Sequence, residues 1–144
     1  MKLALESGEV SAEGLDKRIR DAYRLGFLFL GNELVGIAAL KVPRSSYRAK
    51  VEAGANVGLS GTIYPYELGW VYVREAARGR HGSTLLTESL LREVDAGIFA
   101  TSATDKDRMH GTLRRHGFVE TGVPYPSIEV PGRQLKLFIR RPPA

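Results

Sequence analysis

The stretch ELGWVYVREAARGRHGSTLLTESLL, residues 67–91, combines three kinds of local sequence. Its first part, ELGWVYV (67–73), is rich in aromatic and β-branched residues, which predicts a strand buried on both faces. Its last part, after Gly82, has leucines at helical spacing. The two parts are joined by REAARGRHGS (74–83), a turn with three arginines and two glycines. We therefore expect a strand, a basic turn and the start of a helix in direct succession.

The composition of this turn favours binding of an anion. The first amides of a helix have no partner within the helix, and the helix dipole makes that end electropositive. Gly79 and Gly82 have no Cβ, so the backbone can approach a ligand closely, while Arg78 and Arg80 add positive charge. The turn therefore predicts a phosphate or pyrophosphate site, although it has neither GxxxxGK[ST] nor GxGxxG spacing. The alternative is a surface turn whose arginines point into water.

The sequence before this stretch predicts a helix and a hairpin. SAEGLDKRIRDAY (11–23) offers Ser11 as a helix N-cap, followed by apolar residues at helical spacing. GFLFLGNELVGIAALKV (26–42) has two β-rich runs around a glycine–asparagine turn. Residues 43–66 then form a long connection with room for a short helical turn from Ser45. Connections this long are more often functional or mobile than simple links between two elements.

The sequence after the turn predicts a βαβ unit. GIFATSA (97–103) is typical of a second core strand. A strand–helix–strand order implies a parallel strand pair with a right-handed crossover. The residues expected on the buried side of the helix are Leu85, Leu86, Leu90 and Val94.

A further helix and two terminal strands complete the predicted order. Thr104 or Asp105 is expected to cap the helix, which ends at Gly117. FVETGV (118–123) and RQLKLFIRR (133–141) are predicted strands. The chain is therefore expected to be an α/β protein with some antiparallel strands.

Composition limits the class of protein. The 144 residues are expected to form one domain, 1–144, and 43% hydrophobic with 26% charged residues is ordinary for a globular chain. There is no cysteine, and three histidines lack metal-type spacing, so we expect no metal site. Acidic residues follow the start too closely for a signal peptide, and no apolar run reaches the ~20 residues that cross a bilayer. We expect a cytoplasmic protein with no membrane partner.

The net charge of +5 indicates a surface that attracts anions. Nucleic acid, anionic lipid and a phosphorylated small molecule all fit this charge. A soluble surface with an excess of basic residues fits it equally well.

The central stretch resembles that of the GCN5-related N-acetyltransferase (GNAT) superfamily. In that family a strand ending in V-x-V leads to R/Q-x-x-G-x-G/A and a helix with paired leucines. Here Arg78 occupies the first motif position, while His81 and Ser83 depart from the usual glycine and glycine or alanine. A second block, FATSATDKDRMHGTLRRHGFVETG (99–122), resembles the strand and helix that end in the family's Gly-Phe pair.

The resemblance implies a GNAT-like fold: a mixed, mostly antiparallel sheet with a central splayed parallel strand pair, flanked by helices. It also implies direct transfer of an acetyl group from acetyl-CoA to an amine. Main-chain groups of the first parallel strand would pair with the pantetheine amides, and the turn would hold the pyrophosphate. Lys106 stands where the family tends to have an asparagine that contacts the CoA arm. The implied CoA-binding residues are Val71, Tyr72, Val73, Arg78, Gly79, Arg80, His81, Gly82, Ser83, Thr84 and Lys106.

Glu67 is the residue that the resemblance implies as general base. An alkyl ammonium has a pKa near ~10 and must lose a proton before it attacks a thioester. The alternative for Glu67 is an exposed strand-end glutamate paired with an arginine. The main-chain N–H of Val71 would hold the oxyanion. The position of the family's usual acid, a tyrosine, is Leu113 here, and Tyr72, Tyr125 or Ser102 could replace it.

The acceptor amine is left open by the sequence. Segments 43–66 and 123–133 would border the acceptor side in this fold. Their tyrosines either line a pocket for a small amine or anchor their loops. These tyrosines are Tyr47, Tyr64, Tyr66 and Tyr125. His110 is expected at the surface, and a homodimer could form if the last strand, QLKLFIRR, paired across a two-fold axis.

Two other function classes remain. A protein with this fold could hold acyl-CoA without turning it over, a view that Leu113 and His81 favour. A small nucleic-acid-binding protein would fit the basic charge. It ranks last because aromatic residues are not interleaved with the basic ones as stacking platforms.

Overall fold

A computed structural model describes residues 2–6 and 14–143 of the chain. Its strands are ordered β1-β2-β3-β4-β6-β5 in a six-stranded sheet. The elements are α1 (Lys2–Glu6), α2 (Leu15–Arg20), β1 (Arg24–Leu30), β2 (Glu33–Lys41), α3 (Ser45–Ala55), β3 (Tyr66–Val73), η1 (Glu75–Ala77), α4 (Gly82–Leu91), β4 (Ile98–Ala103), α5 (Asp107–Arg115), β5 (Val119–Pro126) and β6 (Gln134–Arg140).

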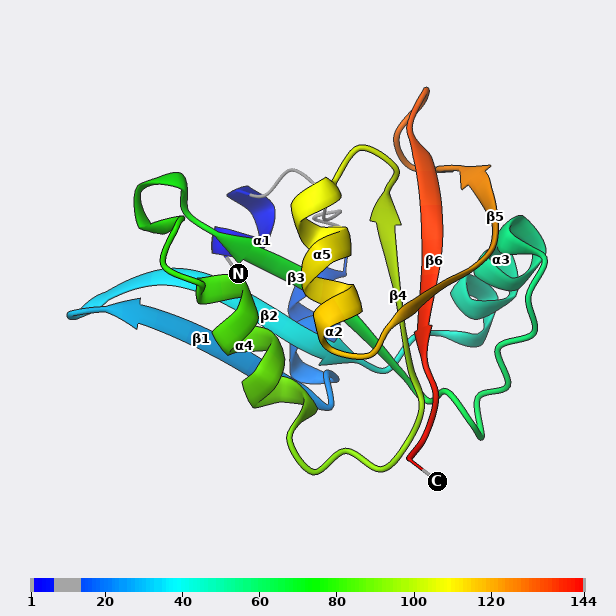
Figure 1. Cartoon of the computed structure of the whole chain (residues 1–144), viewed down its shortest axis with the longest axis horizontal. Helices are drawn as coiled ribbons and strands as arrows, with labels where there is room; N and C mark the ends of the chain where they lie inside the picture. The colour runs from blue at the N-terminus through cyan, green and yellow to red at the C-terminus, as the bar shows by residue number, and fades with distance from the viewer. Residues whose placement is uncertain (1, 7–13, 144) are drawn as a thin grey trace. The chain divides into compact units, whose positions relative to one another are not determined.

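The sheet is mixed, as the sequence predicts (Figure 1). β3 and β4 run parallel, pairing Tyr66 with Ile98 and Glu67 with Phe99. The pairs β1–β2, β4–β6 and β5–β6 are antiparallel. The chain divides into two compact units, one of residues 1–42 and 68–94 and the other of residues 43–67 and 95–144.

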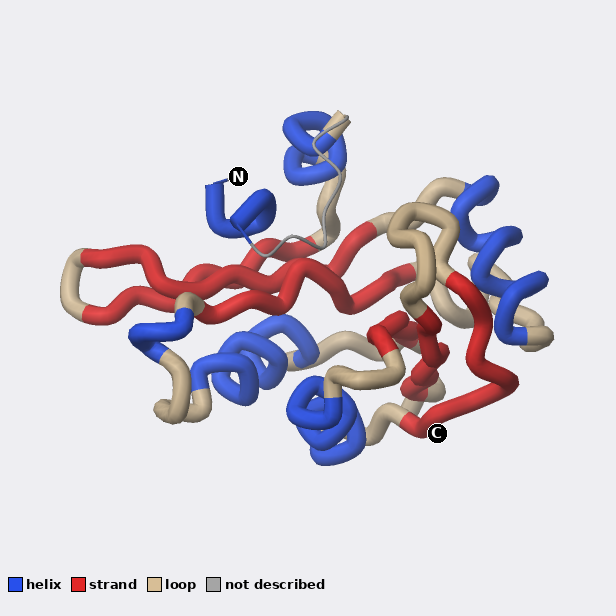
Figure 2. The backbone as a smooth tube through the Cα atoms, turned by 90° about the horizontal axis from the view of Figure 1, so that it is seen from above, coloured by secondary structure: helices blue, strands red, loops and turns tan. Residues whose placement is uncertain are grey.

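The first unit is built on the predicted hairpin of β1 and β2. Gly31 and Asn32 form the turn, with a φ of 62° at Gly31, and Phe27 lies opposite Ile37. Helices α1 and α2 lie on one face of these strands and α4 on the other (Figure 2). α2 occupies the middle of the predicted helix 11–23, and the expected N-cap Ser11 lies outside the described residues.

Helix α4 packs closely on the hairpin because two strand glycines leave room for its leucines. A Cβ added at Gly26 or Gly36 would lie 3.3 Å from the Leu86 side chain.

The prediction that Leu85 faces the core is wrong, because its side chain is 53% exposed. A helix turns about 100° per residue, which places Leu85 roughly opposite the middle of the buried face. The buried residues of the helix are Gly82, Leu86, Thr87, Leu90 and Leu91.

The second unit has a helix where the sequence predicted a loop. Residues 45–55 form α3, three turns long, rather than a short turn at the start of a connection. Arg48 fixes the segment that follows, because its Nη1 donates to the carbonyls of Leu59 (3.1 Å) and Tyr64 (2.7 Å). The helical glycine, Gly54, lets the ring of Tyr125 pack against α3, since a Cβ there would lie 2.6 Å from that ring.

Alternate residues of β6 face two different helices within this unit. Leu137 and Ile139 pack in a cluster with α3 residues such as Val51, while the Phe138 ring lies 5.1 Å from the His110 ring of α5. β6 pairs with β4 along one edge and with β5 along the other. Both edges of β6 are therefore occupied by strands of the same chain, so this strand cannot pair across a two-fold axis, and a homodimer stays a prediction.

Helix α5 begins later than predicted and ends where expected. Its N-cap residue is Lys106 rather than Thr104 or Asp105. Gly117 follows with a φ of 87°, the left-handed conformation that terminates many helices. Within the described residues, no helix is long and apolar enough to cross a membrane.

Candidate active site

The turn predicted to bind an anion joins β3 to α4 within the first unit. After Val73 the chain makes one short helical turn, η1, and continues in extended conformation at Arg78. Gly79 has a φ of 86° and His81 a φ of 58°, both in the left-handed region. A Cβ added at Gly79 would meet no described atom within 4 Å beyond its chain neighbours. The backbone of this turn is therefore open to close approach.

Arg78 is fixed against the end of β3. Its Nε donates a hydrogen bond of 2.8 Å to the carbonyl of Val73, and its Cζ lies 5.6 Å from the centre of the Tyr72 ring. The side chains of Arg78, Arg80 and His81 are exposed. A guanidinium bonded through Nε keeps two terminal nitrogens, so Arg78 can donate to an anion while it stays bonded to the strand.

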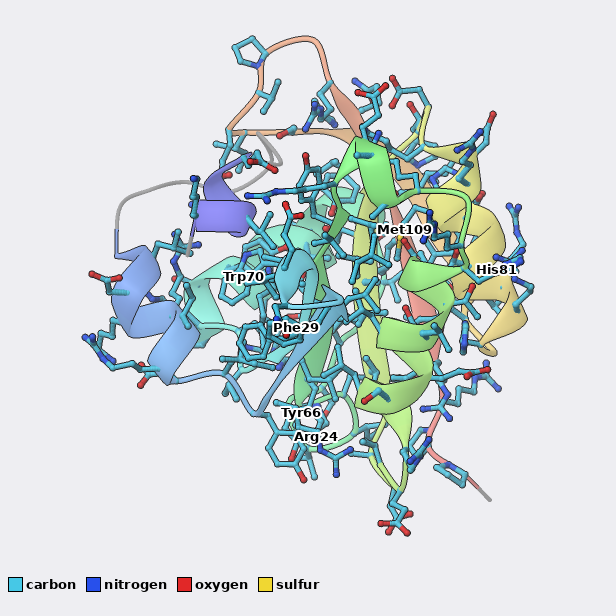
Figure 3. The ribbon with its side chains drawn as sticks, turned by 90° about the vertical axis from the view of Figure 1, so that its left-hand side faces the viewer. Arg24, Phe29, Tyr66, Trp70, His81 and Met109 are labelled. Atoms are coloured by element: carbon cyan, nitrogen blue, oxygen red, sulfur yellow. The ribbon has the colours of Figure 1, made fainter. Side chains whose placement is uncertain are left out.

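The start of α4 presents backbone donors beside these arginines. The Leu85 amide donates to the His81 carbonyl over 3.0 Å, and the amides of residues 82–84 precede this bond at the helix N-terminus. His81 is the N-cap residue and makes no side-chain capping bond to the described residues. Figure 3 labels His81 at this helix start. A Cβ on Gly82 would lie 2.6 Å from Leu28, so glycine lets the helix start pack on the hairpin.

Strand β3 contains a residue in the left-handed region before it reaches the turn. Trp70, labelled in Figure 3, has a φ of 55°, which costs a side-chain-bearing residue about 1–2 kcal/mol. Its ring packs against a cluster that includes Leu15 and Ile37, and the Lys41 Nζ lies 5.1 Å from the ring centre. This conformation interrupts the regular strand immediately before Val71.

Glu67, the expected general base, is buried in the second unit. The residue is 3% exposed, and its Oε2 accepts a hydrogen bond of 2.7 Å from the Tyr47 hydroxyl. A buried carboxylate requires such a partner, because an unpaired one is costly. The alternative of an exposed strand-end glutamate is therefore wrong.

Two tyrosines lie near this carboxylate. Burial, and then the negative charge of Glu67, raise the pKa of Tyr47 well above its usual value, while a hydrogen bond from the Thr101 side chain acts in the opposite direction. Burial and the charge of Glu67 also raise the pKa of Tyr125. The Tyr125 hydroxyl is buried and has no hydrogen-bond partner among the described residues. Both phenols are neutral hydrogen-bond donors at ordinary pH.

The residues predicted for the site fall into two groups. Glu67 and the exposed Lys106 belong to the second unit. The first unit holds Val71, Tyr72, Val73, Arg78, Gly79, Arg80, His81, Gly82, Ser83 and Thr84.

Two residues of α5 have structural roles. The prediction that His110 is at the surface is wrong, because the residue is 2% exposed and its Nε2 lies 2.9 Å from the Ala103 carbonyl oxygen. Leu113, at the family's usual tyrosine position, is fully buried and offers no proton donor.

The bond between Tyr47 and Glu67 is the contact that the sequence analysis missed. It joins α3 to β3 across a separation of 20 residues. Tyr47 was expected either to line a pocket or to anchor a loop. The four-residue spacing of Tyr47, Val51 and Ala55 is a signal for a helix whose buried face includes Tyr47.

Comparison with solved structures identifies the fold. A structure assigned as a phosphinothricin N-acetyltransferase matches with a TM-score of 0.67 and 18% identity, covering 99% of this chain and 88% of that one. A ribosomal-protein-alanine N-acetyltransferase from Brucella melitensis matches with a TM-score of 0.64 and 21% identity, covering 95% and 78%. A GNAT family acetyltransferase from Elizabethkingia anophelis with acetyl-CoA bound matches with a TM-score of 0.62 and 11% identity, covering 92% and 84%.

No family model matches the sequence, and no curated protein matches it. The structural likeness covers nearly the whole chain and includes a GNAT family acetyltransferase with acetyl-CoA bound. The chain therefore has the fold of the GNAT superfamily.

Proposed function

We propose that this chain with the GNAT fold is an acetyl-CoA-dependent N-acetyltransferase, acting as one domain over residues 1–144. The observation that carries the proposal is which residues begin and follow β3. This strand begins beside a buried carboxylate, Glu67, and ends in the open, basic turn that leads to α4. In sequence, β3 thus contains a candidate proton acceptor, Glu67, and is followed by a candidate anion-binding turn.

The turn fits the diphosphate of CoA. The amides from Gly79 to Thr84 supply backbone donors, and the space beside Gly79 admits a phosphate oxygen. Arg78 and Arg80 supply charge, and the bond to Val73 holds Arg78 at the strand end. The left-handed His81 supports this assignment, because strained backbone tends to be kept where it has a function.

The buried carboxylate fits the role of base. Acetyl-CoA supplies the acyl group as a thioester. Glu67 takes a proton from the acceptor ammonium, directly or through one water, so that the neutral amine can attack the thioester carbonyl. The C–N bond forms, the C–S bond breaks, and CoA leaves as the thiolate. The N–H of Val71 stabilises the oxyanion, and the left-handed residue before it supports this assignment by interrupting the strand there.

A protein that holds acyl-CoA without turning it over is the second candidate. The buried Leu113 favours it, because the usual acid for the leaving thiolate has no equivalent at that position. Release of thiol from acetyl-CoA separates the two candidates. An enzyme releases CoA in the presence of a suitable amine, and a passive holder does not.

The test begins with a calorimetric titration of acetyl-CoA and continues with thiol release over a panel of primary amines. We expect saturable binding and amine-dependent release. Glu67→Gln should lower turnover and flatten its rise with pH, while CoA affinity stays within about twofold. No binding at millimolar acetyl-CoA would refute both candidates, and an unaltered pH–rate profile in Glu67→Gln would remove the glutamate as base.

A further inference from the structure

We propose that strand β1 is the docking edge for a second copy of this chain, and that the two β1 strands pair antiparallel across a two-fold axis. In the described part of the chain, β1 pairs with β2 alone and lies at one end of the strand order (Figure 1). An edge strand presents backbone N–H and C=O groups on its outer side, and a further strand can pair with them.

The side chains on one face of β1 are apolar and exposed. Alternate residues of a strand point to the same face, so Leu25, Phe27 and Phe29 form one row. Phe27 is 55% exposed and Phe29 is 59% exposed, and Leu25 is exposed as well. Gly26 lies on the other face, towards α4, since a Cβ there would lie 3.3 Å from the Leu86 side chain. The exposed row is therefore on the face of β1 that α4 does not cover.

The two edge strands of the sheet differ in what protects them from pairing. Natural edge strands are blunted by prolines, charged side chains and interruptions of the ladder. β5, at the other end of the strand order, has two prolines, Glu120 and a break in its pairing with β6 between Thr121 and Tyr125. β1 has no proline, and the irregularity in its hairpin adds the extra residue, Val35, to β2. β1 therefore offers seven consecutive residues to a partner strand.

The sequence of β1 is complementary to itself about Phe27. A two-fold axis perpendicular to the sheet keeps every side chain on its own face, so the two strands must pair residues of the same face. Phe27 is the middle residue of Arg24–Leu30, and an axis there pairs the strands along their whole length. Phe27 then lies opposite Phe27 of the second copy, and Leu25 lies opposite Phe29. Directly opposed apolar side chains of this kind stabilise antiparallel strand pairs.

The charges of β1 permit this pairing. Arg24 is its one charged residue, and its Nη1 donates to the carbonyls of Leu90 (3.1 Å) and Arg92 (2.6 Å) of its own chain. In the dimer the two Arg24 residues lie about 20 Å apart along the strands, well beyond the Debye length of about 8 Å. Each Arg24 lies opposite Leu30 of the other copy, whose hairpin partner Glu33 has the opposite charge. Unlike charges therefore meet at the ends of the interface.

The exposed area is a large part of what a stable dimer needs. The row is extended by Tyr23 and Leu30, which are exposed at the two ends of the strand. With Leu25, Phe27 and Phe29 they supply roughly 450 Å² of apolar surface on each copy, against the ~800 Å² that each partner of a standard interface buries. An exposed apolar patch of this size typically marks an interaction site.

The surface beside the row is hollowed. An apolar pocket there is lined by Ile19, Leu25, Phe27 and Trp70, among other residues. Because Phe29 of the second copy lies opposite Leu25, its ring is placed to fill this pocket. An aromatic side chain in a pocket is the usual anchor of a protein–protein interface.

The first experiment measures the oligomeric state of the full chain by sedimentation velocity over about a hundredfold range of concentration. We expect a dimer that dissociates on dilution. Phe27→Lys places two like charges face to face at the axis and removes two rings, so the dimer dissociation constant should rise at least about 100-fold. The matched control is Leu85→Lys, because the Leu85 side chain is 53% exposed and lies on α4. The control should change the dissociation constant by no more than about twofold.

Two results of this experiment would overturn the proposal. A protein that is monomeric at every concentration would do so, and would leave a foreign strand or an apolar ligand as the occupant of the row. A dimer that Phe27→Lys weakens no more than Leu85→Lys does would show that the contact lies elsewhere. Neither result depends on acetyl transfer, so failure of the dimer and failure of the proposed function are distinguishable.

The second experiment tests the pairing with single cysteines, since the chain has none of its own. An axis at Phe27 brings the two thiols of Phe27→Cys to directly opposed positions, where a disulfide can form. The two thiols of Leu25→Cys lie about 14 Å apart along the pair, beyond the ~7 Å that a disulfide spans between Cα atoms. Under mild oxidation we expect a covalent dimer of Phe27→Cys alone. Equal cross-linking of the two variants, or of neither, would overturn the proposal, and this comparison also decides it if Phe27→Lys does not fold.

Discussion

The Nε of Arg78 donates a 2.8 Å hydrogen bond to the carbonyl of Val73, so the first arginine of the basic turn is fixed to the last residue of β3. The guanidinium carbon also lies 5.6 Å from the centre of the Tyr72 ring. Arg78 therefore has a structural contact in addition to its proposed role at the diphosphate.

This geometry predicts different outcomes for two substitutions of Arg78. Arg78→Ala should weaken acetyl-CoA binding by about 1–3 kcal/mol, as for a lost charge-assisted bond. Arg78→Lys should recover only part of this loss, because lysine keeps the charge but has no Nε–H in a planar fork. Isothermal titration calorimetry at low and moderate salt measures the acetyl-CoA affinity of both variants. Equal affinity in Arg78→Ala and the unaltered protein would contradict the phosphate assignment.

His81 provides a test of backbone strain. Its φ of 58° costs an L residue about 1–2 kcal/mol, whereas glycine adopts it freely at an entropic cost of about 0.5–1 kcal/mol. We expect His81→Gly to be up to about 1 kcal/mol more stable than His81→Ala, which keeps the strain. Urea unfolding of the two variants gives the comparison. Greater stability of the alanine variant would show that the turn is not strained in solution.

Gly122 and Gly132 form a matched pair for steric effects. Both have positive φ, 76° and 80°. A Cβ at Gly122 would lie 2.2 Å from the Ala55 carbonyl oxygen, while one at Gly132 would meet no described atom within 4 Å beyond its neighbours.

Gly122→Ala should therefore lose at least about 2 kcal/mol more than Gly132→Ala, because overpacking adds to the common backbone cost. Thermal or urea unfolding measures the difference. Equal losses would mean that α3 and β5 are not packed as closely as the structure has them.

The buried tyrosines predict a loss of stability in alkali. The pKa values of Tyr47 and Tyr125 are raised in the folded protein, so each stays protonated there at a pH where the unfolded chain releases its proton. The unfolded state binds fewer protons above pH ~10, and stability falls by up to about 1.4 kcal/mol per pH unit for each tyrosine. Below that pH the two groups make no contribution to pH dependence.

The measurement is the free energy of unfolding between pH 8 and pH 11.5 for the unaltered protein, Tyr47→Phe and Tyr125→Phe. Each variant should show a shallower fall above pH ~10. Parallel curves for all three proteins would contradict the raised pKa values.

The parts of the fold that were predictable from sequence depend on local pattern. The hairpin of β1 and β2 follows from alternating β-rich runs around a glycine–asparagine turn. The succession β3, α4, β4 follows from apolar runs and helical spacing. The anion site is proposed from the glycines and arginines of the turn between β3 and α4. His81, which departs from glycine in the family motif, does adopt the left-handed conformation that favours glycine.

The parts that were not predictable depend on contacts between distant residues. Helix α3 was missed because Gly54 weakens its helical signal, and the reason for this glycine is the Tyr125 ring packed against it. The burial of His110 follows from its bond to Ala103 and its packing on Phe138, which no local pattern shows. The bond between Tyr47 and Glu67 likewise requires the fold.

The central claim is that the turn from β3 to α4 holds the diphosphate of acetyl-CoA. A crystal structure of the protein with CoA tests it most directly. We predict phosphate oxygens within hydrogen-bond distance of the amides from Gly79 to Thr84, with the pantetheine beside Val71 to Val73. Density for the diphosphate at any other place on the chain would contradict the claim.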